Sequence, residues 1–217
     1  MQTGSELAGE LRNHWEGLCR RLGLAGDVAG VWGQLRSHYG EAWRAYHNLG
    51  HVGDCLAACA SCRELEFDRD AVEAALWFHD VIYVVGGKDS EARSAEFARE
   101  CLASLGAWPA FVERVVGLIL ATDHRGAPPD IEGQIVCDID LCILGRGIDV
   151  YDRYAAAIQA EVGLAEHVYV PHRQAFLRGM LTKERIFHTD YFGSRYEAAA
   201  RVNMRRELQE WVSRMGQ

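Results

Sequence analysis

Apolar residues recur at helical intervals along almost the whole of this chain, and this periodicity limits the fold more than any other feature. β-branched runs such as VIYVV over 81–85 are short and continue helical patterns. The periodicity predicts ten helices, over residues 5–23, 27–38, 47–64, 68–83, 90–105, 109–122, 133–144, 149–162, 171–181 and 195–212. Turn residues separate them, and no connection has the length of an interdomain linker. We therefore expect an all-α bundle in a single domain over residues 1–217.

The distribution of charge and hydropathy narrows the classes of partner. The 217 residues include 23 basic and 31 acidic side chains, which gives a net charge of −8 with histidine neutral, and no basic stripe. A nucleic-acid polymer is not expected as a partner, because its phosphates are bound by clustered Lys and Arg. Residues 1–12 lack the apolar core of a secretory signal, and no later apolar stretch is long enough to span a bilayer. We expect a cytoplasmic protein without a membrane partner.

The seven cysteines are odd in number, which argues against a framework of disulfides. Most stand among Ala, Leu and Val, where a reduced thiol acts as a small apolar group. Cys59 and Cys62 have the spacing of a zinc knuckle, but no second pair follows, and with Cys55 they recur at helical intervals. We interpret these three as one packed face of a helix.

Two polar residues, His79 and Asp80, follow an apolar run over 71–78 that predicts a buried helix. Buried ionisable groups need a partner, since an unpaired buried charge is strongly disfavoured. A metal ion satisfies both an imidazole and a carboxylate, and a buried ion pair between Asp80 and an arginine is the structural alternative. The pair is therefore a candidate for metal binding.

A second pair, His47 and His51, is four residues apart, so on one helix the two side chains share a face. The same spacing occurs in HExxH metalloproteases, but Asn48 stands where that motif has its glutamate, and protease chemistry is not favoured. Taken alone, the two histidines would also suit surface or capping roles. Together with His79 and Asp80 they become candidate ligands.

Two acids, Asp138 and Asp140, interrupt another apolar helical run. Residues two apart on a helix point about 200° apart, so only one of them can readily reach a given ion. The chain thus offers imidazoles and carboxylates to one divalent cation, in the order H…HD…D, if the helices that carry them pack together.

In this order the motifs resemble those of the HD superfamily of metal-dependent phosphohydrolases, and in particular a bacterial branch of it. The likeness extends over much of residues 44–207. It is carried by RAYHNLGHV (44–52), WFHDVIY (77–83), SEARSA (90–95), ILATDH (119–124) and DIDLCILG (138–145). YHNxxH over 46–51 is also similar to a motif of the eukaryotic cyclic-nucleotide phosphodiesterases, which are distant relatives.

The resemblance implies an HD-type helical bundle with its motif core at about 44–145, completed by C-terminal helices over 149–213. It implies a divalent cation, which would be Mn, Mg, Co, Fe, Zn or Ni. The implied ligands are His51, His79, Asp80 and Asp140, with Asp138 as the alternative ligand. Asp140 ranks first because the later metal aspartate of the phosphodiesterases precedes a leucine, as Asp140 does.

The implied activity is hydrolysis of a small phosphate ester, for which a nucleotide fits the superfamily best, by water that the cation activates. Asp80 or Asp138 would take the proton of the water, and His47 would protonate the leaving alkoxide, as the first histidine of the phosphodiesterase motif does. Three cations in or beside the motifs are candidates for binding the phosphate, with a solvated surface charge as the alternative for each: Arg44, Lys88 and Arg125.

Two further polar residues of the matched segments have alternative interpretations. Glu91 lies at the start of a predicted helix, where it favours the helix dipole, or it lies beside the metal. His124 follows another predicted helix, where it is a C-terminal cation, lines the pocket or holds a second ion. Ser90 and Val162 depart from the pattern of the bacterial branch at positions that are not proposed ligands.

Other functions remain open at this point. Some HD proteins are diiron oxygenases with two added histidines between the HD pair and the last aspartate, whereas this chain has only His124 in that interval. A non-catalytic module that binds a nucleotide or a partner is a third interpretation, which the retention of all four ligand types disfavours. The C-terminal apolar stripes, such as the one containing Phe176, fit either the core or the interface of a homodimer.

Overall fold

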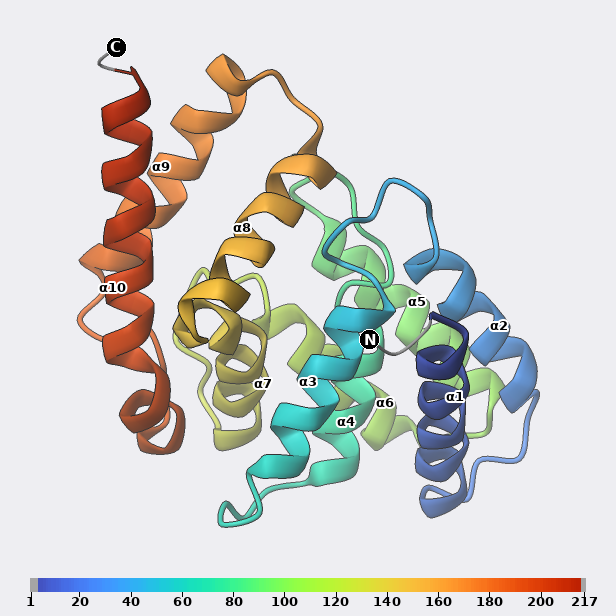
Figure 1. Ribbon diagram of the computed structural model, residues 1–217. Helices are drawn as coiled ribbons and strands as arrows, with labels where there is room; N and C mark the ends of the chain where they lie inside the picture. The colour runs from blue at the N-terminus through green and yellow to red at the C-terminus, as the bar shows by residue number, and fades with distance from the viewer. Residues whose placement is uncertain (1–3, 216–217) are drawn as a thin grey trace. The chain divides into compact units, whose positions relative to one another are not determined.

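The structure, a computed structural model, describes residues 4–215, so the first three residues of the expected signal-free N-terminus and the last two of the chain lie outside it. The described residues form ten α-helices and one 3₁₀ helix, without any strand (Figure 1). The elements are α1 (Gly4–Arg21), α2 (Val28–Tyr39), α3 (Leu49–Ser61), α4 (Arg69–Phe78), α5 (Ser90–Ser104), α6 (Pro109–Ala121), α7 (Ile131–Leu141), η1 (Cys142–Gly145), α8 (Ile148–Val162), α9 (Glu166–Thr182) and α10 (Asp190–Met215). The all-α class predicted from the periodicity is confirmed.

The chain divides into two compact units, Met1–Val136 and Cys137–Gln217, where the sequence predicted a single domain. The first unit holds α1 to α6 and the beginning of α7, and the second holds the end of α7 and the elements that follow. Four of the five motif segments, all except residues 138–145, lie in the first unit.

Short polar side chains begin three helices of the first unit. Asp27, Asn48 and Asp68 are the N-caps of α2, α3 and α4, and each side chain accepts a hydrogen bond from a backbone N–H of the first turn. Such caps satisfy amide groups that have no partner inside the helix. These local signals explain why the predicted and observed starts of the helices agree to within about two residues.

The core of the first unit forms around α4, whose residues from Ala71 to Phe78 are all buried. Trp77 lies at its centre, with Trp15 of α1 and Trp32 of α2 packed edge to face at ring-centre distances of 5.8 Å and 6.0 Å. Edge-to-face pairs of this kind stabilise a core beyond the area they bury. The apolar run over 71–78 therefore does form the buried helix that the sequence predicted.

Two helix boundaries at the motifs differ from the predicted ones. The helix predicted over 47–64 begins at Leu49, because Asn48 turns its side chain back to the N–H of Gly50 and caps it. His47 lies in the preceding turn, so His47 and His51 do not share a helix face. The helix predicted over 68–83 ends at Phe78, with His79 as its C-cap.

The early end of α4 has a physical cause in Arg44. The Arg44 guanidinium donates to the backbone oxygens of Asp80 and Val81, which are thereby engaged outside any helical ladder. Val81 N–H itself bonds to the oxygen of Phe78, three residues back, which is a turn. The chain therefore leaves the helix at the His79–Asp80 pair.

In the second unit, α10 begins at Asp190, five residues before the predicted start. Both carboxylate oxygens of Asp138 accept hydrogen bonds from the backbone N–H groups of His188 and Thr189, and Thr189 Oγ1 accepts from Phe192 N–H. The partner that orders this helix start lies about 50 residues away in the sequence, so periodicity could not predict it.

The start of α9 also differs from its prediction. The helix begins at Glu166 and contains Pro171, the residue at which the sequence placed its start. Proline removes one backbone donor from a helix interior, which is why it was interpreted as a start. Gly163, at a φ of 63°, ends α8 in the left-handed conformation and leaves only a short connection to α9.

A buried ion pair joins α9 and α10. Arg173 binds both carboxylate oxygens of Glu207 at 2.9 Å and 3.0 Å, and the hydroxyl of Tyr151 on α8 donates to the same carboxylate at 2.6 Å. Burial alone would raise the pKa of Glu207, but the hydrogen bonds and charge of Arg173 prevail and the pKa lies below its usual range.

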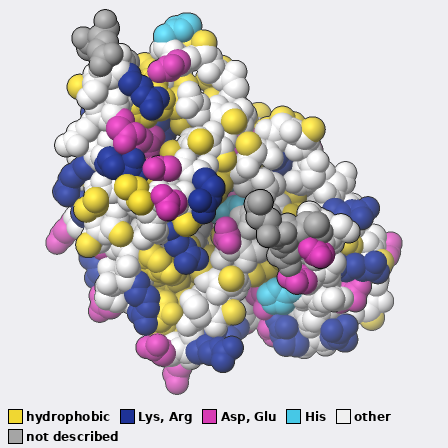
Figure 2. Space-filling model, in the orientation of Figure 1, with side chains coloured by type: hydrophobic (Ala, Val, Ile, Leu, Met, Phe, Trp, Pro, Cys, Tyr) yellow, Lys and Arg dark blue, Asp and Glu magenta, His cyan; other side chains and the backbone are white. Residues whose placement is uncertain are grey.

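No helix among residues 4–215 combines the length and apolarity needed to cross a membrane. On the face that Figure 2 shows, Lys and Arg side chains lie intermixed with Asp and Glu.

All seven cysteines are buried and none forms a disulfide, as predicted. On α3, burial raises the pKa of Cys59 to about 12, which keeps this thiol protonated and unreactive.

Candidate metal centre

The first candidate ligand, His51, lies in the opening turn of α3. Asn48 caps the helix immediately before it, which fixes the direction in which the turn leaves. The side chain is buried, with 3 % of its surface exposed. A buried imidazole in this position needs polar neighbours, and these come from the end of α4, which packs beside α3 (Figure 1).

The second candidate ligand, His79, has a defined orientation. Its backbone N–H completes the last helical hydrogen bond of α4, to Ala75, and its Nδ1 lies 2.9 Å from the backbone oxygen of Leu76. A carbonyl oxygen only accepts, so Nδ1 carries the proton and donates. Nε2 is then the ring nitrogen that faces His51 and Asp80, as in histidines that bind metals through Nε2.

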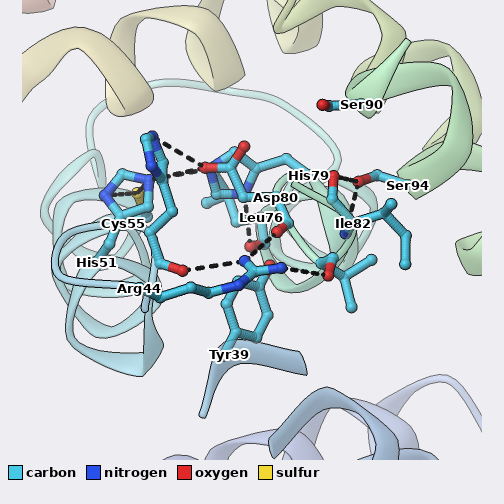
Figure 3. Close-up of polar contacts among 12 residues, drawn as sticks. Tyr39, Arg44, His51, Cys55, Leu76, His79, Asp80, Ile82, Ser90 and Ser94 are labelled. Carbon is cyan, nitrogen blue, oxygen red and sulfur yellow. Dashed lines mark hydrogen bonds and ion pairs between the residues drawn. The ribbon is translucent and has the colours of Figure 1, made fainter. Parts of the chain in front are cut away.

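Three ligand atoms converge in the first unit (Figure 3). His51 Nε2 and His79 Nε2 are 3.1 Å apart, and Asp80 Oδ2 lies 3.1 Å from His79 Nε2 and 3.5 Å from His51 Nε2. Two atoms bound to one ion at about 2.1 Å are about 3.0 Å apart at a right angle and about 3.4 Å apart at the tetrahedral angle. The observed separations fall around these values, so the three atoms fit a shared ion.

The electrostatics of Asp80 suit the same role. Burial on its own would raise the pKa of this carboxyl, but charge on His79 and His47 and hydrogen bonds from His51 and His79 bring the pKa well below its usual range. A carboxylate that stays ionised when only 16 % exposed requires such positive surroundings. It is ready to bind a cation without first losing a proton.

Sequence analysis did not consider Cys55 as a ligand. Its sulfur lies 3.7 Å from Nε2 and 3.8 Å from Nδ1 of His51, one turn earlier on α3. The ligand atoms of His51, Cys55 and His79 lie within 4.8 Å of one another, and this buried group could hold a metal ion. The four-residue spacing of His51 and Cys55 could have indicated this, because it places both side chains on one face of a helix. However, equal distances to both nitrogens place the sulfur beside the ring rather than in line with one lone pair.

The predicted general acid, His47, lies at the edge of this cluster. Its Nε2 is 4.0 Å from Asp80 Oδ2, and its side chain is 16 % exposed. The ring of Tyr83 covers it, with ring centres 4.1 Å apart and planes inclined by 30°. Although His47 is not on α3, the turn before Asn48 still brings it to the carboxylate.

Arg44 joins the two motif segments. Its Nη1 donates to the backbone oxygen of Asp80 at 2.7 Å (Figure 3) and to that of His47 at 3.0 Å. Its Nη2 donates to the backbone oxygen of Val81 at 2.9 Å, and its Nε donates to Glu41. All three nitrogens are engaged, and only 1 % of the side chain is exposed. This geometry favours a positioning role for Arg44 over the phosphate contact that we expected.

Two buried serines hold the segment that follows the His79–Asp80 pair. The sequence did not predict this role for either of them. Ser94 Oγ accepts from Ile82 N–H and donates to Ile82 oxygen, and Ser90 Oγ accepts from Val84 N–H. These contacts attach the segment after Asp80 to α5. The SxxxS spacing at the start of a helix was the signal, since it places both hydroxyls on one helix face.

The other predicted substrate contacts lie in loops and helix ends of the first unit. Lys88 is exposed, and its backbone oxygen accepts from Arg125 Nη2 at 3.3 Å, so the two loops are adjacent. Glu91 is in the first turn of α5. His124 has a φ of 53°, a left-handed conformation that residues with a side chain rarely adopt. Its backbone N–H bonds to the oxygen of Ala121, so this residue closes the turn that follows α6.

The two later aspartates are on α7 within the second unit. Asp138 is fully buried and accepts hydrogen bonds from His188 N–H, Thr189 N–H and the Thr189 hydroxyl at 2.6–2.8 Å. Burial raises its pKa even though these hydrogen bonds oppose the shift. Asp140, two residues on, is half-buried in the last turn of α7. The engagement of Asp138 favours Asp140 of the two as a ligand.

Comparison with models of protein families, with curated proteins and with solved structures found no match to this chain.

Proposed function

We propose that this protein is a metal-dependent phosphohydrolase that acts on a small phosphate ester. One observation carries the proposal: His51 Nε2, His79 Nε2 and Asp80 Oδ2 lie at the mutual distances expected of ligands around one ion. The donor set of two imidazoles and a carboxylate suits a divalent transition metal or zinc. When bound, such an ion supplies a Lewis acid for the phosphoryl group and for a water molecule.

Asp140 is our proposed further ligand. The order of the motifs implies it, and its neighbour Asp138 accepts the hydrogen bonds that order the start of α10. A second carboxylate balances the charge of a divalent cation better than one carboxylate with two neutral imidazoles does. Cys55 serves in this account as a packing partner of the His51 ring rather than as a ligand.

We assign the two proton transfers of the reaction to Asp80 and His47. Asp80 directs Oδ2 at the two imidazoles, and in this proposal its carboxylate also accepts the proton of the attacking water. His47, 4.0 Å from Oδ2, holds a proton and donates it to the leaving alkoxide. Lys88 and Arg125 remain the candidate contacts of the phosphate, since Arg44 has no free donor nitrogen.

The first test is release of inorganic phosphate from nucleoside monophosphates and sugar phosphates, with the purified protein loaded with Mn²⁺, Mg²⁺, Co²⁺ or Fe²⁺. The Asp80→Asn variant keeps the shape of the side chain and removes its charge. We expect it to lower kcat by about 1,000-fold or more, since it loses a ligand and a proton acceptor together. Metal content, measured in parallel, should fall in the same variant.

A matched control is Asp54→Asn, which removes an exposed acid from the same helix as His51. It should hydrolyse the substrate at the rate of the wild type. The proposal fails if no phosphate ester is hydrolysed by protein that holds stoichiometric metal, or if Asp80→Asn retains full activity.

A further inference from the structure

An aromatic surface continues outward from His47. Tyr83 lies on the His47 ring at 4.1 Å between ring centres, and Trp43 lies nearly parallel to Tyr83, with centres 6.0 Å apart and planes inclined by 17°. The three rings come from two segments, the turn before α3 and the segment after Asp80. They therefore form a continuous stack that begins at the predicted general acid.

Trp43 is unusual among the tryptophans of this chain. Trp43 and Trp108 are 41 % and 50 % exposed, whereas the other four are at most 6 % exposed. An exposed indole forfeits the stabilisation that its burial would give, and single exposed apolar residues are common. Here, however, the exposed ring adjoins the candidate site, and Val84 next to Tyr83 is also 42 % exposed.

The position of Trp43 is fixed from within the protein. The buried guanidinium of Arg44 lies 5.2 Å from the centre of the Trp43 ring, and its hydrogen bonds hold it to both motif segments. A guanidinium at this distance attracts an aromatic ring. The indole is thus ordered before any ligand arrives, which reduces the entropy that binding costs.

The order of groups matches the order of parts in one class of substrate. The ligand cluster comes first, then His47, then Tyr83, and Trp43 last at the surface. In a nucleotide the phosphate comes first, then the ester oxygen, the sugar and a planar base. Bases stack on aromatic side chains with little dependence on sequence, because every base presents a π face.

We propose that Trp43 and Tyr83 form the surface on which the planar ring of the substrate stacks, so that the site selects phosphate esters of nucleosides over those of simple sugars. This inference rests on the proposed function for the place of the phosphate. It assigns Trp43 a role in specificity that no motif of the sequence indicated.

The first experiment measures binding without hydrolysis. Adenosine, which carries no phosphate, is titrated by calorimetry into the wild type and into Trp43→Leu, Trp43→Phe and Trp108→Leu. Loss of one stacked base weakens binding by about 5- to 150-fold, so Trp43→Leu should show a loss in this range. Trp43→Phe keeps a ring and should retain most of the affinity, and Trp108→Leu, which alters the other exposed tryptophan, should bind as the wild type does.

The second experiment compares kcat/KM for adenosine monophosphate and ribose 5-phosphate. In Trp43→Leu the loss for the nucleotide should exceed the loss for the sugar phosphate at least fivefold, mainly through KM. Thermal unfolding of each variant confirms that it folds, and leucine retains the apolar bulk that the fold needs.

The two experiments separate failure of the inference from failure of the proposed function. Hydrolysis of both substrates with an unchanged ratio in Trp43→Leu would overturn the stacking surface and leave the phosphohydrolase intact. Adenosine binding that depends on Trp43, in a protein that hydrolyses nothing, would support the stacking surface and refute the hydrolase. Absence of adenosine binding to the wild type would overturn the stacking surface.

Discussion

Residue identity determined which side chains could be recognised before the structure and which could not. His51, His79 and Asp80 were predicted as candidate ligands because their types and order suit a metal site, and the structure brings their atoms together. Arg44 was predicted to hold phosphate, but its donors face backbone oxygens of residues about 37 positions later. A sequence shows that an arginine is present, whereas the carbonyl groups it binds are common to every residue and carry no signal.

The buried carboxylate of Glu207 predicts how the stability of the protein depends on pH. Its pKa is depressed in the folded protein, so its pairing with Arg173 and Tyr151 stabilises the fold above the unfolded pKa, near 4.5, and this contribution is lost as pH falls through the folded value. Glu207→Gln should lower the free energy of unfolding by roughly 3 kcal/mol at pH 7 and by much less at pH 3. Urea unfolding across this range measures the difference.

The control for this pH dependence is Glu210→Gln on the same helix. Glu210 is 48 % exposed and pairs with Arg206 at the surface, so its removal should change the free energy of unfolding little at either pH. A constant difference between wild type and Glu207→Gln from pH 3 to pH 7 would contradict our account of the pair.

At the scale of elements, periodicity located all ten α-helices of residues 4–215, and two of the departures occur where a distant side chain sets a boundary. α4 ends early because Arg44 takes the next carbonyl oxygens, and α10 begins early because Asp138 accepts its first N–H groups. Local caps such as Asn48 were visible in the sequence, but the prediction treated Asn48 as a helix interior. A local cap can thus be read from neighbouring residues in the sequence, whereas a tertiary cap cannot.

The cap of α3 links an element to the site. Asn48→Ala should lower the free energy of unfolding by about 1 kcal/mol, as loss of an N-cap does, and should also weaken metal binding about tenfold, because His51 is in the turn that the cap holds. Asp27→Ala removes the N-cap of α2 and should give a similar loss of stability with unchanged metal affinity. Equal metal affinities in the two variants would show that the cap of α3 does not affect the metal site.

At the scale of the whole molecule, the all-α class followed from the apolar pattern, but the division into two units did not. The boundary between Val136 and Cys137 lies inside α7, in a buried apolar stretch without glycine, proline or a charge run. Composition signals a boundary only where a linker is exposed, and a continuous helix conceals one.

Substitution of the two acids of α7 distinguishes the proposed ligand from its neighbour. Asp140→Asn should weaken metal binding at least tenfold, because a proposed carboxylate ligand is lost. Asp138→Asn should leave metal affinity unchanged and lower the free energy of unfolding by roughly 2 kcal/mol, since an amide nitrogen would face the N–H groups that Asp138 now satisfies. The reverse pattern of losses would identify Asp138 as the ligand.

The most direct test of the metal centre is a calorimetric titration of chelator-treated protein with Mn²⁺, alongside His79→Ala. The convergence of His51, His79 and Asp80 predicts at least one ion per chain in the wild type and a loss of affinity of about 100-fold in the variant. Wild-type protein that binds no ion, or a variant that binds as the wild type does, would contradict the metal centre.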